Sequence, residues 1–114
     1  MVDRIYSFLG LIQKSGNLVS GSDAVEGEIK RKKCKLLIIS EDASENTRKR
    51  FEVLAEEHNI NYVNFGTKID IGIAIGKRER SIIGVCDENF SKGFLSSLEK
   101  NLSGGEHIVK GKNI

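Results

Sequence analysis

The hydrophobic residues near the start of the chain recur with the period of an amphipathic helix. Between residues 2 and 14 they occupy positions i, i+3, i+4 and i+7, which are Ile5, Phe8, Leu9 and Ile12. This spacing places the four side chains on one stripe of a helix, where they can pack against a core. We expect Gly16 to end the helix, since glycine is typical of the position after a helix.

Four short segments further along have the pattern of β-strands. Residues 36–39 form an unbroken apolar run, which is typical of a strand covered on both faces, so we expect this strand at the centre of a sheet. Residues 62–65 and 81–86 predict two more buried strands, and residues 17–20 predict an edge strand.

Residues that cap helices stand between these strands. The expected N-caps of the last three helices are Ser44, Thr67 and Asp87. Ser20 and Asp23 have the spacing of a capping box, so a further helix is expected to begin near Gly21 or Ser22 and to run into a basic block. Gly76 is expected to close the short helix that begins after Thr67.

Helices and strands therefore alternate along the chain. Alternation at such short spacing predicts an α/β fold, a three-layer α/β/α sandwich with a four-stranded mixed sheet and five helices. The 114 residues fit one domain, expected over residues 1–102, and residues 103–114 offer so little to bury that they predict a flexible tail. No apolar run or hydrophobic leader predicts a membrane segment, so we expect a cytoplasmic protein.

Charge is segregated along the chain although the net charge is only +2. Five of the six residues from 30 to 35 are basic, and residues 48–50 and 77–80 form further basic clusters. The first block has two interpretations: a solvated helix end that matches the helix dipole, or a contact for a polyanion.

Three enzymatic interpretations fail on residue type and spacing. Residues 72–77 have three residues between glycines where a phosphate-binding loop needs four, and Arg78 stands where Ser or Thr would hold magnesium. Cys34 and Cys86 form no C-x-x-C pair and are interpreted as buried free thiols. The carboxylate pair at residues 87–88 suits a helix cap. We expect no catalytic residue, cofactor or metal.

Basic residues near two turns predict a surface for a phosphate backbone. Strand ends and helix starts meet at common edges of an alternating sheet, so the turn at Gly21 and the loop at Gly76 are expected to share one edge. A helix start offers unpaired backbone N–H groups, and Lys77, Arg78 and Arg80 add positive charge beside them.

Several segments between residues 4 and 100 also carry a family pattern. They are residues 18–21, 39–44, 46–47 and 55–77. In the last segment the pattern's positions hold Ala55, Ile60, Tyr62, Lys68 and Gly72, while Asn61 replaces a proline and Ile71 a leucine. These segments resemble the RNA-binding ribosomal proteins L7Ae and L30e and, within that family, the small bacterial YlxQ-like branch.

The resemblance implies a three-layer domain that binds structured RNA, in many members a kink-turn, which is a sharply bent duplex with tandem G·A pairs. It implies a Gly-X-Asn-Glu-X-X-Lys motif at the start of the second helix and an apolar, basic loop before the last strand. Gly21 matches the motif, but Asp23, Ala24 and Gly27 stand where Asn, Glu and Lys are expected. Glycine cannot replace a lysine donor to guanine, so we expect backbone binding to persist while base specificity is weakened or changed.

The leading hypothesis is a non-catalytic RNA-binding protein, ribosomal or ribosome-associated, whose partner is ribosomal RNA or another structured RNA. Its predicted RNA-binding residues are Gly21, Ser22, Asp23, Lys30, Arg31, Ile75, Gly76, Lys77, Arg78 and Arg80. The alternative is a protein-interaction module that kept the scaffold and lost specific RNA binding. A third hypothesis, the substrate domain of an RNA methyltransferase, is disfavoured because the sequence carries no catalytic domain.

Overall fold

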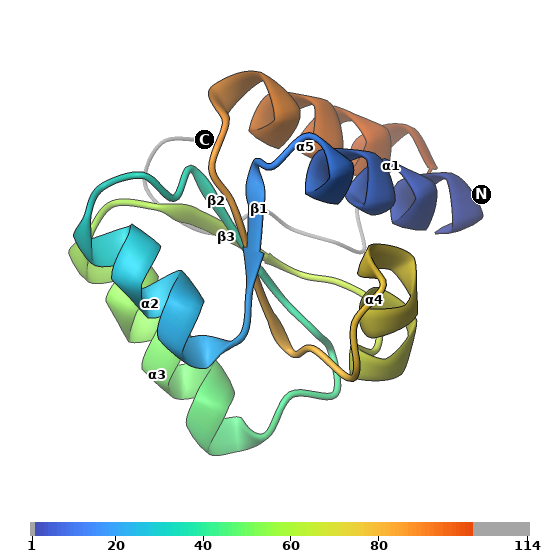
Figure 1. The fold of residues 1–114 in the computed structure, drawn as a ribbon. Coiled ribbons are helices and arrows are strands. Elements are labelled where there is room, and N and C mark those ends of the chain that lie inside the picture. The colour runs from blue at the N-terminus through green and yellow to red at the C-terminus, as the bar shows by residue number, and fades with distance from the viewer. Residues whose placement is uncertain (1, 102–114) are drawn as a thin grey trace.

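Five helices and four strands alternate along residues 2–101, the part of the chain that the computed structural model describes (Figure 1). The helices are α1 (Val2–Lys14), α2 (Ser22–Lys30), α3 (Glu45–Glu57), α4 (Lys68–Ile75) and α5 (Glu88–Asn101). The strands are β1 (Leu18–Ser20), β2 (Leu36–Ile39), β3 (Asn61–Asn64) and β4 (Ile82–Val85). The tail predicted at residues 103–114 lies outside the described residues.

The four strands form one mixed sheet in the order β1-β4-β2-β3. β2 and β3 are parallel, whereas β4 runs antiparallel to both of its neighbours, β1 and β2. The predicted central and edge positions of β2 and β1 are therefore confirmed. β3 begins one residue earlier than predicted, and β4 covers only the middle of the predicted segment 81–86.

β2 contributes to two hydrophobic cores, one on each face of the sheet. Leu36 and Ile38 belong to the core covered by α1, α4 and α5, whereas Leu37 and Ile39 belong to the core covered by α2 and α3. All four side chains are fully buried, which explains the unbroken apolar run in the sequence. Figure 1 shows the two helix layers with the sheet between them, so the predicted α/β/α sandwich is confirmed. Among the described helices, none has the length and apolar character needed to cross a membrane.

Side-chain caps begin three of the helices as predicted. Ser44, Thr67 and Asp87 each accept a hydrogen bond from a backbone N–H in the first turn of the following helix, at 3.2, 3.2 and 2.9 Å. The start of each helix is thus specified locally, since capping satisfies N–H groups that have no partner within the helix.

The predicted capping box at Ser20 is wrong. The N-cap of α2 is Gly21, which has no side chain to accept a hydrogen bond. Ser20 instead ends β1, and its Oγ accepts a hydrogen bond from Arg80 Nε at 3.1 Å. A contact between residues sixty positions apart therefore takes the hydroxyl that the local pattern assigned to a cap.

The chain turns sharply after α4 and folds back against that helix. Gly76 ends the helix in the left-handed conformation, with φ +73°, as the sequence predicted. Lys77 N then donates to Gly72 O at 2.8 Å, and a Cβ at position 72 would lie only 2.2 Å from Arg78 O. Gly72 is therefore needed because the returning backbone occupies the space of a side chain.

Replacing Gly72 with alanine should destabilise the protein, because neither the helix nor the returning backbone can give way cheaply. We expect a loss of about 1–3 kcal/mol in the free energy of unfolding, measured by urea denaturation. Gly27→Ala is the matched control, since a Cβ at that helical glycine would lie an ordinary 3.6 Å from Arg31 Nη1. The control should gain roughly 0.5–1 kcal/mol from helix propensity. Equal stability of the two variants would contradict the close approach of the backbone at Arg78 to Gly72.

Candidate nucleic-acid interface

One edge of the sheet gathers the turn and the loop that the sequence singled out. Since β1, β2 and β3 run in one direction and β4 in the other, the ends of the first three strands and the start of β4 lie together; we call this the exit edge. Gly21 N donates to Ile82 O at 2.9 Å, and Ser40 N donates to Ser81 O at 2.8 Å. The start of α2 and the α4–β4 loop therefore share this edge (Figure 1).

Gly21 starts α2 in a backbone conformation that favours glycine. Its φ is +94°, and no heavy atom would lie within 4 Å of an added Cβ, so the backbone angle rather than crowding explains the residue. Because this N-cap has no side-chain acceptor, the N–H groups of the first turn lack the partner that Ser or Asp would supply. Such N–H groups and the positive end of the helix dipole suit an anion.

A hollow of about 310 Å³ lies between the start of α2 and the α4–β4 loop. Its lining residues are Ser20, Gly21, Ser22, Thr47, Glu79, Arg80, Ser81 and Ile82. The hydrogen bond from Arg80 Nε to Ser20 Oγ fixes the guanidinium at the wall of this hollow. Arg80 Nη1 also donates to Glu79 O at 3.0 Å, which leaves other guanidinium N–H groups as donors for an oxygen ligand.

The α4–β4 loop carries positive charge that no ion pair neutralises within the part of the chain described. Lys77 and Arg78 are exposed, Arg80 is half-buried, and none of the three lies within ion-pair distance of a described carboxylate. Glu79, also exposed, is the one acidic residue of the loop against these three basic residues. The loop therefore keeps an excess of positive charge at the exit edge.

Several further carboxylates lie near this edge, among them Glu41, which is exposed shortly after β2, and they have different surroundings. Asp23 is exposed in the first turn of α2, where a negative charge suits the helix dipole. Asp42 accepts a hydrogen bond from Lys68 N at 3.0 Å. Burial alone would raise the pKa of Asp42, but hydrogen bonds, chiefly that from Lys68 N–H, outweigh it and hold the pKa below its ordinary value. The Asp42 carboxylate is thus engaged at the start of α4.

The apolar side chains that α4 exposes differ from the one predicted. Ile75 was expected to contact RNA, but its side chain is only 5% exposed and belongs to the core under α1, α4 and α5. Ile69 and Ile73 are 54% and 71% exposed, and the sequence interpretation missed both. A signal was present, because Ile71 and Ile75 lie four residues apart on one helix face, which leaves Ile69 and Ile73 to share another.

Lys30 and Arg31 lie away from the other predicted site residues. Lys30 is the last of the nine residues of α2 and Arg31 is its C-cap, about 13 Å of helix from Gly21, at the opposite edge of the sheet. Lys30 Nζ pairs with Glu26 Oε2 and Arg31 Nη1 with Glu28 Oε2, both at 2.9 Å. The structure does not bring this part of the basic block to the exit edge.

Glu26 also pairs with Arg50 and so joins α2 to α3. Hydrogen bonds from Lys30 and Arg50 hold the pKa of the Glu26 carboxyl below its ordinary value. The single carboxylate of Glu26 thus partly neutralises two basic side chains within the protein, as is common for a helix end in solvent.

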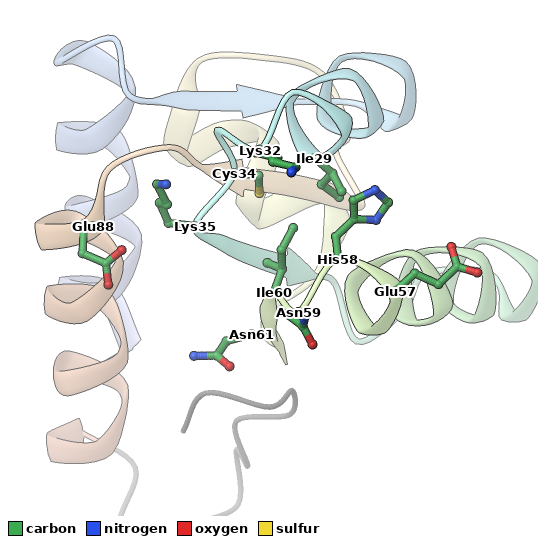
Figure 2. A pocket seen from close by; sticks show the side chains of 10 residues that line it. All are labelled: Ile29, Lys32, Cys34, Lys35, Glu57, His58, Asn59, Ile60, Asn61 and Glu88. Carbon is green, nitrogen blue, oxygen red and sulfur yellow. The ribbon is translucent and has the colours of Figure 1, made fainter.

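A second hollow, of about 540 Å³, lies at the opposite edge (Figure 2). Lys32 and Lys35 line it together with Glu57 and Glu88, so its charges are mixed. Cys34 is buried there, and burial raises the pKa of its thiol to about 12, which keeps the sulfur protonated and poorly nucleophilic. Within the described residues, no group of three or more His, Cys, Asp or Glu side chains could hold a metal ion.

Comparison with known proteins gives matches over most of the chain. A family model described as the ribosomal protein L7Ae/L30e/S12e/Gadd45 family matches residues 3–95. RNA-binding protein YlxQ of Bacillus subtilis (strain 168) is 32% identical over 94 residues, which cover 82% of this chain and 94% of that protein.

Two solved structures extend this similarity to the fold. A protein of unknown function from Bacillus halodurans has a TM-score of 0.77 and 32% identity, with 81% of this chain and 93% of that chain covered. The Giardia lamblia 15.5kD RNA binding protein has a TM-score of 0.68 at 16% identity, with 85% of this chain and 86% of that chain covered. At that identity the second match supports the fold alone.

These matches confirm the resemblance inferred from the turn at Gly21 and from residues 55–77, and they confirm the expectation of a non-catalytic protein. The family model spans the exit edge, including both the start of α2 and the α4–β4 loop. The chain belongs to the ribosomal protein L7Ae/L30e/S12e/Gadd45 family.

Proposed function

We propose that this protein binds structured RNA at the exit edge without catalysing a reaction. The observation that carries the proposal is the junction of the Gly21 turn with the α4–β4 loop, where Arg80 Nε donates to Ser20 Oγ. The junction sets the N–H groups of a helix start beside Arg80, and Lys77 and Arg78 precede Arg80 in the same loop. Helix-start N–H groups and exposed cations are common ligands of nucleic-acid phosphates.

We propose the class of RNA from the family resemblance and from the chemistry of bent RNA. The Bacillus subtilis relative is named an RNA-binding protein, which supports RNA as the partner. A sharply bent RNA exposes base edges and unstacked bases that a regular duplex hides in its deep major groove. We therefore propose a kink-turn-like RNA as ligand, within ribosomal RNA or its assembly intermediates in the cytoplasm.

Under this proposal, α2 reads the bases of the RNA less well than a helix that carries the complete family motif. Asp23 and Ala24 lie exposed in the first turn, and Gly27 occupies the next turn of the helix. None of these side chains donates a hydrogen bond to guanine O6 or N7, as a lysine would. Phosphate contacts would then supply most of the affinity, and such contacts depend strongly on salt.

Replacing Lys77, Arg78 and Arg80 together with alanine should weaken RNA binding and reduce its salt dependence. Each lost phosphate contact lowers the slope of log K against log salt by about 0.7–0.9, so the triple variant should lose roughly two units. Binding is measured by fluorescence anisotropy with a labelled kink-turn RNA over a salt series, and thermal melting checks that each variant is folded.

The matched control removes the same charge from the opposite edge by replacing Lys32, Lys33 and Lys35 with alanine. These three lysines are exposed, and two of them line the hollow in Figure 2. The control should keep the wild-type slope. An unchanged slope in the loop variant, or an equal decrease in both variants, would overturn the exit-edge assignment.

A lysine at position 27, where the family motif has lysine and this chain has glycine, should restore base reading. Gly27→Lys places a donor four residues after Asp23, on the same face of α2. We expect kink-turn affinity to rise by about 1–3 kcal/mol, or roughly 5- to 150-fold, with no such rise for a stem whose tandem G·A pairs are replaced by Watson–Crick pairs. Gly27→Ala separates this gain from helix stabilisation, and no gain over that control would refute the kink-turn alignment.

A further inference from the structure

α4 is apolar on two sides, although only one side faces the core. Ile71 is fully buried and Ile75 is 5% exposed, whereas Ile69 and Ile73 are 54% and 71% exposed. The exposed pair lies four residues apart, so both side chains share one helix face. An exposed apolar patch rimmed by polar groups typically marks a binding site.

This exposed face lines a hollow together with the α4–β4 loop. The hollow measures about 660 Å³ and is lined by Ile69, Ile73, Lys77, Arg78 and Glu79. It forms because the loop folds back against Gly72, which brings two cations alongside the exposed isoleucines. Glu79 lines both this hollow and the one beside Gly21, so the two hollows adjoin at the exit edge.

The face is also held in place by the helix layer beneath it. A Cβ at Gly10 of α1 would lie 2.9 Å from Ala74 O, so the backbones of α1 and α4 approach closely at that point. Ile71 and Ile75 fix the other side of α4 in the core. The isoleucine face therefore lies on a helix that is already packed in place. A ligand that binds this face has little of the helix to order.

We propose that the Ile69–Ile73 face receives an unstacked nucleobase of the bound RNA, while Lys77 and Arg78 hold the phosphates that flank it. This inference rests on the proposed RNA-binding function and names the part of the RNA that α4 contacts. The pairing of an apolar surface with a cationic rim fits a ligand that has a flat ring on an anionic backbone. A protein segment or a second copy of this chain would bury the isoleucines equally well, but neither needs two adjacent cations.

Salt dependence distinguishes a base contact from a phosphate contact. An isoleucine releases no counterion when a base packs against it, so its loss should lower affinity and leave the salt slope unchanged. The contact should also require an unpaired nucleotide, because a paired base keeps its faces stacked within the duplex.

The test uses the full chain with Ile69 and Ile73 both replaced by alanine, and Val53→Ala as control. Val53 is 52% exposed on α3 and also β-branched, so it matches the chemistry at a distant site. The probes are a stem–loop with a bulge that carries 2-aminopurine and the same stem without the bulge. We expect the double variant to bind the bulged RNA on the order of five- to twentyfold more weakly, with unchanged slope and a smaller change in 2-aminopurine emission. The control should match the wild-type protein on both RNAs.

Each other outcome overturns the inference in a recognisable way. Equal affinity of the double variant and the wild-type protein for the bulged RNA would refute the base contact and leave the proposed function standing. A lower slope in the double variant would mean that the substitutions displace Lys77 or Arg78. Self-association that is lost in the double variant while RNA affinity is unchanged would assign the face to a second copy. Absence of RNA binding by the wild-type protein would refute the proposed function itself.

Discussion

The return of the chain from α4 into β4 is the constraint on which the candidate interface depends. Arg80 ties three separate segments together, because its N–H donates to Lys68 O at 3.0 Å and its Nε donates to Ser20 Oγ at 3.1 Å. Gly72 lets the loop lie against the helix where a side chain would collide with it. With the loop held in this way, Lys77 and Arg78 extend from a fixed support rather than from a free turn. A support of this kind lowers the entropy cost of ordering the two cationic side chains when a ligand binds.

The position of the counter-charges then decides which basic residues are available to a polyanion. At the far end of α2, Lys30 and Arg31 each have a glutamate of their own helix within 2.9 Å. Exposed pairs of this kind add little stability, but they do cancel the charge that a phosphate would meet. The α4–β4 loop has no such pairs to described carboxylates, so a chain with a net charge of only +2 keeps a locally positive loop at this edge. Distribution, rather than total charge, is therefore what relates this protein to nucleic acid.

Sequence patterns were sufficient where a local interaction decides the structure. The run at residues 36–39 predicted the central strand because a strand with helices on both faces must be apolar at every position. Ser44, Thr67 and Asp87 predicted helix starts because each cap bonds within its own first turn. Ser20 could not be assigned in this way, since its hydroxyl bonds a side chain sixty residues away. In the same way, an isoleucine at every second position of α4 surrounds the helix with apolar side chains, and only the packing of α1 against α4 decides which of them are buried.

The departures at the motif positions and the exposed face of α4 have a common physical consequence under the proposed function. With Asp23, Ala24 and Gly27 in place of the family's polar and basic residues, α2 offers few groups that distinguish one base from another. Cations at the exit edge position a backbone but carry no sequence information. An aliphatic face beside them adds a different kind of selectivity, because every base has a flat face but only an unpaired nucleotide can bring that face to the protein. Recognition by such an edge would therefore select the shape of an RNA, meaning a bend with an unstacked nucleotide, more than its sequence.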